Sequence, residues 1–411
     1  MIEKHVKGKK MNEHNNNVDI FKKCKKLTRY ESLMRENTYP YFRKVESAQD
    51  AEVIIEGKKV LMMCSNDYLG LSNDIRLKKA VIDAVNKYGC ACTGSRYANG
   101  NLDIHEKLEE ELAEFIGKES GQIFNSGFMT NLGVIESIVG PCDVAVTDKY
   151  DHTSIEVGCR VSSGRRVRFA HNDMDNLEHV LRNLQGADGI LVIVDGVFSL
   201  EGDITNLPEV VRLAKKYKAR VMLDDAHAFG VIGKTGRGTI EHYGMDPKDV
   251  DIYMNTFSKS LASLGGYVAA DKDIILYIKH FAKSQIFTVG LSPADVAAAT
   301  KALEIIKENP ERRKILWSNA KKMREGLKDI GFDLGSSCTQ IASVMIRDEK
   351  AILKMWQIFK EEGIHVMIAL FPGVPRGGEL IRLTCTANHT DAHINKVIEV
   401  FKKAGKIAGL I

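Results

Sequence analysis

Between about residue 72 and residue 300, short apolar runs alternate with segments in which apolar residues recur at helical spacing. Strands that alternate with helices in this way indicate a mostly parallel sheet with helices on both faces. The runs predicted as strands are Gly121–Phe124, Val144–Thr147, Gly189–Val194, Arg220–Leu223, Asp251–Met254 and Tyr267–Ala270. A helix is expected to open at Asp103, where Asp103-Ile104-His105-Glu106 resembles a capping box.

The pattern changes on either side of this region. Residues 40–63 contain strand-like pieces around a turn at 56–59, and a long helical segment runs from Ser292 to about Ile330. Apolar runs at 341–346, 364–368 and 380–385 then precede a terminal helix, which indicates a smaller α+β domain. The predicted parts are an N-terminal segment with a basic tail, a helix and strands (1–60), a large domain (61–300) and a small C-terminal domain (301–411).

The composition is that of an ordinary globular protein, with 44% apolar and 27% charged residues. Its eight cysteines form no C-x-x-C pair. Their scatter favours a reducing compartment over a disulfide framework or a zinc site. No apolar run approaches the roughly 18 residues that would span a bilayer. We therefore expect a cytoplasmic protein without a metal site.

The positive charge is concentrated at the N-terminus. Residues 1–30 carry nine Lys and Arg against three acidic residues, so this tail has a charge of +6 and the rest of the chain −2. Ile20, Phe21, Cys24 and Leu27 fall on one helical face, which suits either a helix docked on its own domain or a helix at a membrane surface. Because the rest of the chain is slightly acidic, nucleic acid is not an expected partner.

The most informative segment is Thr256-Phe257-Ser258-Lys259, which follows the predicted strand at 251–254. A lysine held in a fixed place, with its charge disfavoured, can form an imine with a carbonyl cofactor such as pyridoxal phosphate (PLP). The hydroxyl and glycine residues nearby suit a phosphate. The alternative is a solvated lysine in a loop of small residues.

Polar residues also follow other predicted strands. Asp224 ends a buried strand, where a carboxylate needs a partner, and a protonated pyridine nitrogen would supply one. His227 could then bond the phenolic oxygen of that ring, although Asp224 and His227 could also be a metal-binding pair or part of a capped turn. His152 could stack on a planar ring or be structural, and Ser199 could bond the phenolic oxygen or simply form a turn.

Another small-residue turn, Asn125-Ser126-Gly127-Phe128, opens a predicted helix whose first N–H groups could hold a phosphate. Many strand–helix turns look similar. Taken together, however, these segments place the candidate chemistry at the carboxyl ends of the predicted parallel strands, where open α/β sheets bind ligands.

The blocks and their order along residues 38–411 resemble the α-oxoamine synthases, which are fold-type-I PLP enzymes. The resemblance rests on Ser65–Leu71, Thr93–Arg96 with Asn99-Gly100, Asn125–Phe128, Asp195–Ser199, Asp224–His227, Thr256–Lys259, and Arg382 followed by Thr386–Thr390. It implies a large domain with a mostly parallel seven-stranded sheet flanked by helices, a smaller C-terminal α+β domain, and a homodimer with shared active sites.

The resemblance also implies a role for each matching residue. Lys259 would be the Schiff-base lysine and proton-transfer base, Asp224 the pyridinium partner, and His152 the stacking ring. Of the remaining residues, His227 and Ser199 would contact the phenolic oxygen of the cofactor. Its phosphate would be held by Gly127, Phe128 and Thr256, and Thr288 would contact the phosphate of the cofactor bound to the neighbouring subunit. The substrate carboxylate would be bound by Arg382 and Asn66.

Within this family, the chain resembles most the bacterial serine palmitoyltransferases, in Tyr39–Arg43, Glu46–Asp50 and Thr256–Gly266. This implies condensation of L-serine with a long-chain acyl thioester, carried by CoA or a carrier protein, with loss of carbon dioxide. The short segment at 372–378 is nearer to members that use glycine or alanine. Those donors, or a sulfonated amino acid, therefore stay open, as do an aminotransferase and a non-enzymatic scaffold.

Overall fold

The structure is a computed structural model that describes residues 19–184 and 186–411. It divides into two compact units, the first ending at Phe42 and the second spanning Arg43–Ile411. Most of the basic tail therefore lies outside the described residues. In the described part of the first unit, a 3₁₀ helix (η2, Ile20–Lys25) precedes α1 (Thr28–Arg35), and Ile20 and Phe21 are 69% and 67% exposed. The single helical face predicted through Leu27 is thus broken after Lys25.

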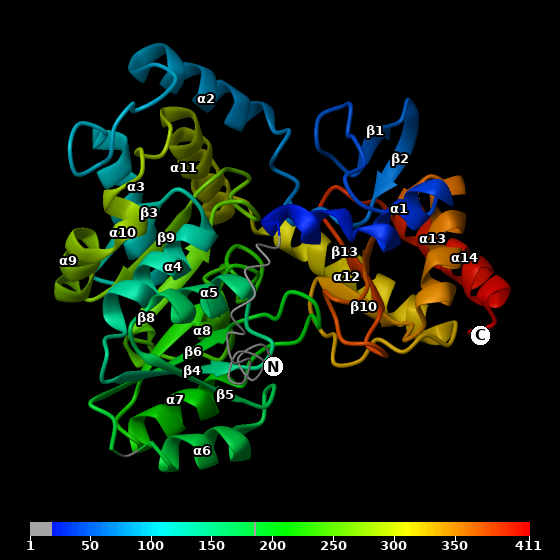
Figure 1. Cartoon of the computed structure of the whole chain (residues 1–411). Coiled ribbons are helices and arrows are strands. Elements are labelled where there is room, and N and C mark those ends of the chain that lie inside the picture. Colours follow the sequence, from blue (N-terminus) through cyan, green and yellow to red (C-terminus); the bar gives the residue numbers. More distant parts are fainter. Residues whose placement is uncertain (1–18, 185) are drawn as a thin grey trace. The chain divides into compact units, whose positions relative to one another are not determined.

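The second unit contains the predicted seven-stranded sheet, in the order β3-β9-β8-β7-β6-β4-β5 (Figure 1). Strand β9 is antiparallel to both of its neighbours and the remaining pairs are parallel, as expected. The strands are β3 (Ser120–Phe124), β4 (Asp143–Asp148), β5 (Arg165–Phe169), β6 (Gly189–Asp195), β7 (Arg220–Asp224), β8 (Ile252–Thr256) and β9 (Gly266–Ala270).

Strand β5 is the one strand of this sheet that the sequence analysis missed. Its sequence, Arg165-Arg166-Val167-Arg168-Phe169, contains three arginines, and only Phe169 is fully buried. The strand pairs with β4 alone, at the edge of the sheet. An edge strand has a solvated side and needs no apolar run, so the apolar pattern could not identify it.

Helices cover both faces of the sheet because residues along each strand alternate between two apolar clusters. One cluster packs α4, α5 and α9 against residues such as Phe124 and Ile193, and the other packs α2, α3, α6, α7 and α11 against residues such as Ile123 and Val194. The helices of this region are α2 (Ile75–Tyr88), α3 (Asp103–Ile116), α4 (Gly127–Ile138), α5 (Thr153–Val161), α6 (Met174–Arg182), α7 (Leu207–Lys216), α8 (Thr239–His242), η3 (Pro247–Asp249), α9 (Lys272–Phe281), α10 (Lys283–Ile286) and α11 (Pro293–Glu308).

Two helix predictions need correction. The segment predicted as one helix from Ser292 to about Ile330 is two helices, because Asn309 leaves the helical conformation and Pro310 begins the next helix. Helix α3 does begin at Asp103, but its capping contact comes from His105: His105 Nδ1 accepts the Leu102 N–H at 3.0 Å.

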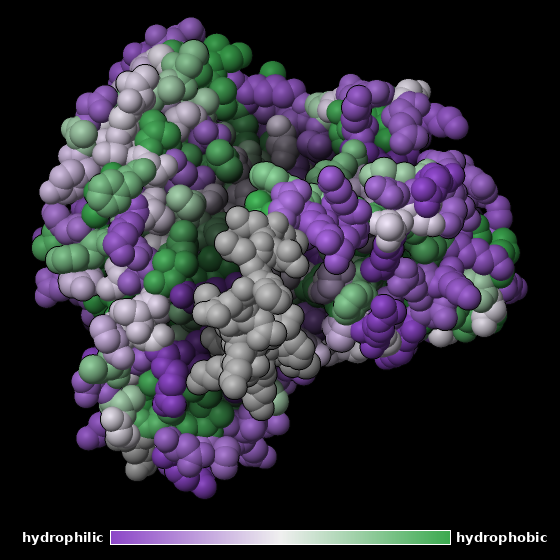
Figure 2. Space-filling view, in the orientation of Figure 1, coloured by the Kyte–Doolittle hydropathy of each residue, from purple (hydrophilic) through white to green (hydrophobic). Residues whose placement is uncertain are grey.

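The C-terminal part is built from two three-stranded sheets and three helices. One sheet has the order β10-β13-β12; in the other, β1 and β2, from near the start of this unit, are joined by β11. Its elements are β1 (Glu52–Ile55), β2 (Lys58–Met62), α12 (Pro310–Asp329), β10 (Ile341–Met345), α13 (Glu349–Glu361), β11 (Ile364–His365), β12 (Met367–Ala369), β13 (Leu380–Thr384) and α14 (Asp391–Ala408). In Figure 2, the surface over α13 and α14 is mostly hydrophilic.

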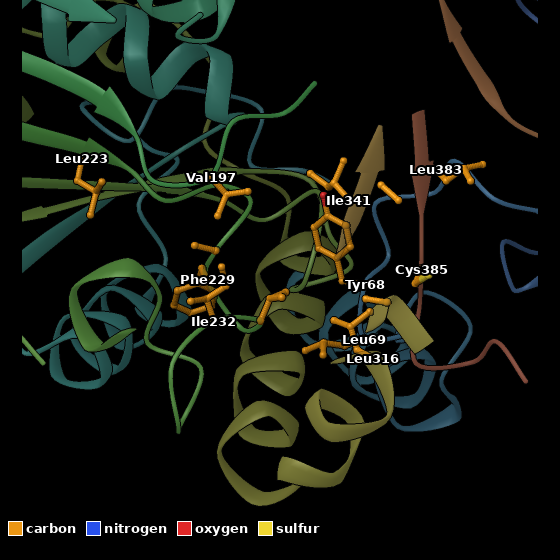
Figure 3. Packing of buried hydrophobic residues seen from close by; sticks show 14 of the residues in the cluster. Tyr68, Leu69, Val197, Leu223, Phe229, Ile232, Leu316, Ile341, Leu383 and Cys385 are labelled. Atoms are coloured by element: carbon orange, nitrogen blue, oxygen red, sulfur yellow. The ribbon is translucent and has the colours of Figure 1, made fainter. Parts of the chain in front are cut away.

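A continuous apolar cluster joins the large sheet to the C-terminal part. It runs from Leu223 of β7 through Phe229 to Leu316 of α12 and Leu383 of β13, with Tyr68 among its fully buried members (Figure 3). Because protein interiors are close-packed, such a cluster holds the two parts in a fixed geometry. Residues near the ends of β7 and β13 can therefore belong to one site. None of the described helices is long and apolar enough to cross a membrane.

Candidate active site

A cavity of about 260 Å³ lies at the carboxyl ends of the parallel strands. Seven residues predicted for the site line it: Gly127, Phe128, His152, Asp224, His227, Thr256 and Lys259. Asp224 and Thr256 end β7 and β8, and the others come from the segments that follow β3, β4, β7 and β8. The structure therefore brings together the chemistry that the sequence analysis placed at separate strand ends.

Asp224 is the last residue of β7 and is only 5% exposed. Its Oδ2 accepts a hydrogen bond from Asn131 Nδ2 at 2.7 Å, and its Oδ1 accepts the Ala226 N–H at 3.0 Å. A buried carboxylate is costly without such donors. These two bonds fix the carboxylate at the cavity wall, where it can face a cationic ring nitrogen.

Lys259 lies in the loop after β8, and its amine has no hydrogen-bond partner among the described residues. Burial and, to a smaller extent, the nearby Arg382 lower the pKa of Lys259 to about 8, against the opposing influence of the Asp224 and Asp195 carboxylates. A lysine with this pKa is partly neutral near physiological pH, whereas an ordinary lysine is almost fully charged. It can therefore act as a nucleophile or as a base.

His152 caps the N-terminus of α5. Its Nδ1 accepts the Ser154 N–H at 3.2 Å and lies 2.7 Å from Ser154 Oγ, which in turn lies 2.8 Å from Asn131 Nδ2. Burial lowers the pKa of His152. The ring is thus held in place by the first turn of α5 and by α4.

His227 is 7% exposed, and its Nδ1 lies 2.6 Å from the hydroxyl of Tyr68. Burial lowers the pKa of His227 well below its usual value, and Lys259 and Arg382 act in the same direction. The imidazole is therefore neutral at physiological pH. A neutral ring anchored through Nδ1 has its other nitrogen available to a ligand.

One end of the cavity is suited to an anion. Helix α4 begins at Gly127, so the N–H groups of Gly127 and Phe128 have no acceptor within the helix. Thr256 packs closely against this turn, because a Cβ atom added to Gly127 would lie only 2.8 Å from the Thr256 Cβ. The hydroxyls of Thr256 and Ser258 lie 3.0 Å apart beside it.

The remaining predicted residues lie outside the lining of this cavity. Arg382, in β13, is 5% exposed and donates from Nε to the Ser199 carbonyl at 2.5 Å and from a terminal nitrogen to Asn66 Oδ1 at 3.2 Å. Within the described part of the chain it forms no ion pair with a carboxylate. Thr288 accepts a hydrogen bond from Asn125 at 3.3 Å in its own chain.

Known proteins match the chain over almost its full length. A family model for class I and II aminotransferases matches residues 58–401. A serine palmitoyltransferase of Sphingobacterium spiritivorum is 45% identical over 91% of this chain and 94% of its own length. An 8-amino-7-oxononanoate synthase of Thermosipho melanesiensis is 42% identical over 93% and 97%. The solved serine palmitoyltransferase of S. paucimobilis with a bound PLP–myriocin aldimine matches with a TM-score of 0.93 and 33% identity, over 96% of this chain and all of that one.

The chain belongs to the class I and II aminotransferase family. It is a PLP-dependent α-oxoamine synthase, an acyltransferase, as the sequence resemblance predicted. The fold-type-I architecture is likewise confirmed.

The donors in this α-oxoamine synthase fit PLP. The first turn of α4 and the Thr256 hydroxyl offer hydrogen bonds for a phosphate, and Asp224 offers a buried carboxylate for a protonated ring nitrogen. The Lys259 amine, with a pKa of about 8, suits an imine with the aldehyde. When bound, PLP supplies an electrophilic carbonyl and an electron sink.

Four residues that hold this site were not predicted from the sequence: Asn131, Ser154, Asp195 and Tyr68. Asn131 and Ser154 bond the residues that were predicted, as described above. Asp195 Oδ2 accepts the His152 N–H at 3.2 Å, and Tyr68 contacts His227. Tyr68 and Asp195 lie inside motifs quoted for the resemblance, Asn131 lies three residues after one, and Ser154 lies two residues after His152. Their roles, however, depend on how side chains meet across elements.

The partly buried His171 bonds one residue at the end of β4 and one in the segment between β6 and α7. His171 Nδ1 lies 3.0 Å from Asp148 and its Nε2 lies 3.1 Å from Asp203, and 18% of its side chain is exposed. Burial alone would lower the pKa of His171, but the bonds to the two carboxylates outweigh it and raise the pKa to about 10. His171 is therefore a cation at physiological pH.

We expect His171→Gln to change how stability depends on pH. Because the pKa of His171 is raised on folding, its contribution is fully present below about pH 6.5, the pKa of an unperturbed histidine, and is lost as pH rises toward 10. The variant should lose about 2–4 kcal/mol of unfolding free energy at pH 6, and less at pH 10. Urea unfolding at several pH values measures this, with exposed His179→Gln as the control. An equal loss at pH 6 and pH 10 would contradict the ion-pair account.

Proposed function

We propose that the protein condenses L-serine with a long-chain acyl thioester, releasing carbon dioxide and the free thiol and giving a 3-keto amino alcohol. The observation that carries this proposal is the buried Arg382 guanidinium, which has no carboxylate partner among the described residues and lies close enough to lower the pKa of Lys259 and His227. An arginine in this setting is suited to a substrate carboxylate.

Three groups would carry out the chemistry: the substrate-binding Arg382, the base Lys259 and the carboxylate of Asp224. Arg382, with Asn66 beside it, holds the carboxylate of the amino acid and orients the Cα–H bond. Lys259 removes the α-proton, because its lowered pKa leaves a neutral amine close to physiological pH. Asp224 keeps the ring nitrogen of PLP protonated, so that the cofactor can accept the electrons left on Cα.

Other residues would bind the cofactor. His152 stacks on its ring, His227 and Ser199 contact the phenolic oxygen, and Gly127, Phe128 and Thr256 hold the phosphate. Thr288 would reach the phosphate of a second copy of the chain in a homodimer. In support of that contact, Phe287 and Val289, on either side of Thr288, are 83% and 45% exposed.

Serine is proposed because curated serine palmitoyltransferases from three other bacteria, in addition to the one described above, are 41% identical to this chain. The second candidate uses the same chemistry with a different amino acid, such as alanine or glycine. It is supported by the 42% identity to an 8-amino-7-oxononanoate synthase.

Lys259→Ala should abolish the covalent link to PLP but preserve binding through the phosphate contacts and Asp224. Turnover should fall by about 10⁴-fold, since both the nucleophile and the base are lost. Borohydride reduction followed by peptide mapping should locate PLP on Lys259 in the parent and on no peptide of the variant. Lys272→Ala, at an exposed lysine, is the control. Recovery of the label on another lysine in the parent would refute the assignment.

The amino-acid donor can be identified by thiol release. Purified enzyme with palmitoyl-CoA should release free CoA with L-serine and much more slowly with L-alanine or glycine. If alanine or glycine supports release and serine does not, the second candidate replaces the first. If none of the three does, but an amino group exchanges with a keto acid, the enzyme is not using this chemistry.

We also propose that the basic N-terminal segment brings the enzyme to an anionic membrane, near an amphiphilic acyl donor. The exposed Ile20 and Phe21 lie next to Lys22 and Lys23 in η2, and each lysine can contribute about 1 kcal/mol on anionic lipid. Deleting residues 1–27 should reduce sedimentation with phosphatidylserine vesicles in a salt-sensitive way and leave turnover of water-soluble short-chain donors unchanged. Equal sedimentation of both proteins would refute the contact.

A further inference from the structure

We propose that Asn131 and Ser154 are positioning residues, which form a directional hydrogen-bond chain from Asp224 to His152 and hold His152 as the tautomer with its proton on Nε2. This hydrogen-bond chain joins Asn131 of α4 and Ser154, in the first turn of α5, to the end of β7. It uses three buried side chains: Asn131 and Ser154 are each 1% exposed and Asp224 is 5% exposed.

The direction of the chain is fixed first at His152. The Ser154 backbone N–H points to Nδ1 at 3.2 Å, and a backbone N–H can only donate. Nδ1 is therefore an acceptor, and the proton of the neutral ring lies on Nε2. The Ser154 hydroxyl, 2.7 Å from the same nitrogen, must donate to it as well.

The direction then follows through Asn131. Because the Ser154 hydroxyl donates its one hydrogen bond to His152, its oxygen accepts the hydrogen bond from Asn131 Nδ2 at 2.8 Å. The second amide proton goes to Asp224 Oδ2 at 2.7 Å. Asn131 Oδ1 has no hydrogen-bond partner among the described residues, and flipping the amide would turn that oxygen toward a carboxylate. The amide orientation is thus set by the charge of Asp224.

This arrangement gives His152 a defined role. Two donors on Nδ1 disfavour its protonation, in agreement with the lowered pKa of His152, so the ring stays neutral. It then offers Nε2–H as a donor to an acceptor atom of the substrate. Neither Asn131 nor Ser154 needs to touch the reacting atoms. The catalytic consequence rests on the proposed function, but the tautomer of His152 does not.

The test is nitrogen-15 NMR of histidine-labelled enzyme, with and without PLP, in which the His152 signals are identified by their loss in His152→Gln. In the parent enzyme, His152 should have Nε2 protonated and Nδ1 unprotonated. Ser154→Ala and Asn131→Leu should each raise the pH at which His152 titrates and lower kcat by about tenfold, the effect of roughly one hydrogen bond, with little change in KM. Because the residues act in one chain, the double variant should lose no more than the larger single effect.

Ser162→Ala is the matched control, since its hydroxyl bonds the Cys159 carbonyl at the other end of α5, at 2.9 Å. It should leave the His152 signals and kcat unchanged. A parent enzyme with the proton on Nδ1 would overturn the proposal without any variant, and so would additive effects in the double variant. If the parent enzyme neither binds PLP nor converts substrate but His152 keeps its proton on Nε2, the proposed function is wrong and the proposed hydrogen-bond chain is still supported.

Discussion

The site depends on a carboxylate held out of water. Asp224 is buried at the end of β7, directly opposite Asp195 of β6 in the parallel register, and burial raises the pKa of Asp195 well above its usual value. Asp224 has two hydrogen-bond donors that stabilise its charge, whereas one oxygen of Asp195 has no donor in the part of the chain that the structure describes. This difference suits Asp224 to the role proposed for it, that of the charged partner of a ring nitrogen, and the other site residues are arranged around it.

The charge of Asp224 influences the pKa and the orientation of the neighbouring groups. Burial lowers the pKa of Lys259 to about 8, and the Asp224 carboxylate limits how far this pKa falls. Asn131 is oriented by the same carboxylate, and through Ser154 it reaches His152. Hydrogen bonds in a buried chain polarise one another, so a change at one position is felt at the others. Electrostatics of this kind, set before the substrate arrives, are the main source of transition-state stabilisation in many enzymes.

Much of this could be predicted from the sequence. The apolar runs identified six of the seven strands of the large sheet, and because parallel strands end at one edge, residues following those strands were expected to meet, as His152, Asp224 and Lys259 do. The arginine-rich edge strand β5 lacked the apolar signal. Asn131 and Ser154 were not predicted, since their contacts depend on how α4 and α5 are turned. Arg382 and Asn66 lie 316 residues apart, and only the family resemblance suggested that they act together.

The central claim is that Asp224 acts as the electronic partner of the cofactor and not merely as a buried structural acid. The most direct measurement is the exchange of the α-proton of L-serine with deuterated solvent in Asp224→Asn, in the absence of an acyl donor. The amide matches the carboxylate in size but cannot stabilise a protonated ring nitrogen. The account predicts that the variant folds, retains PLP at high concentration and exchanges the proton at least about 10²-fold more slowly than the parent. Exchange at the parent rate would contradict it.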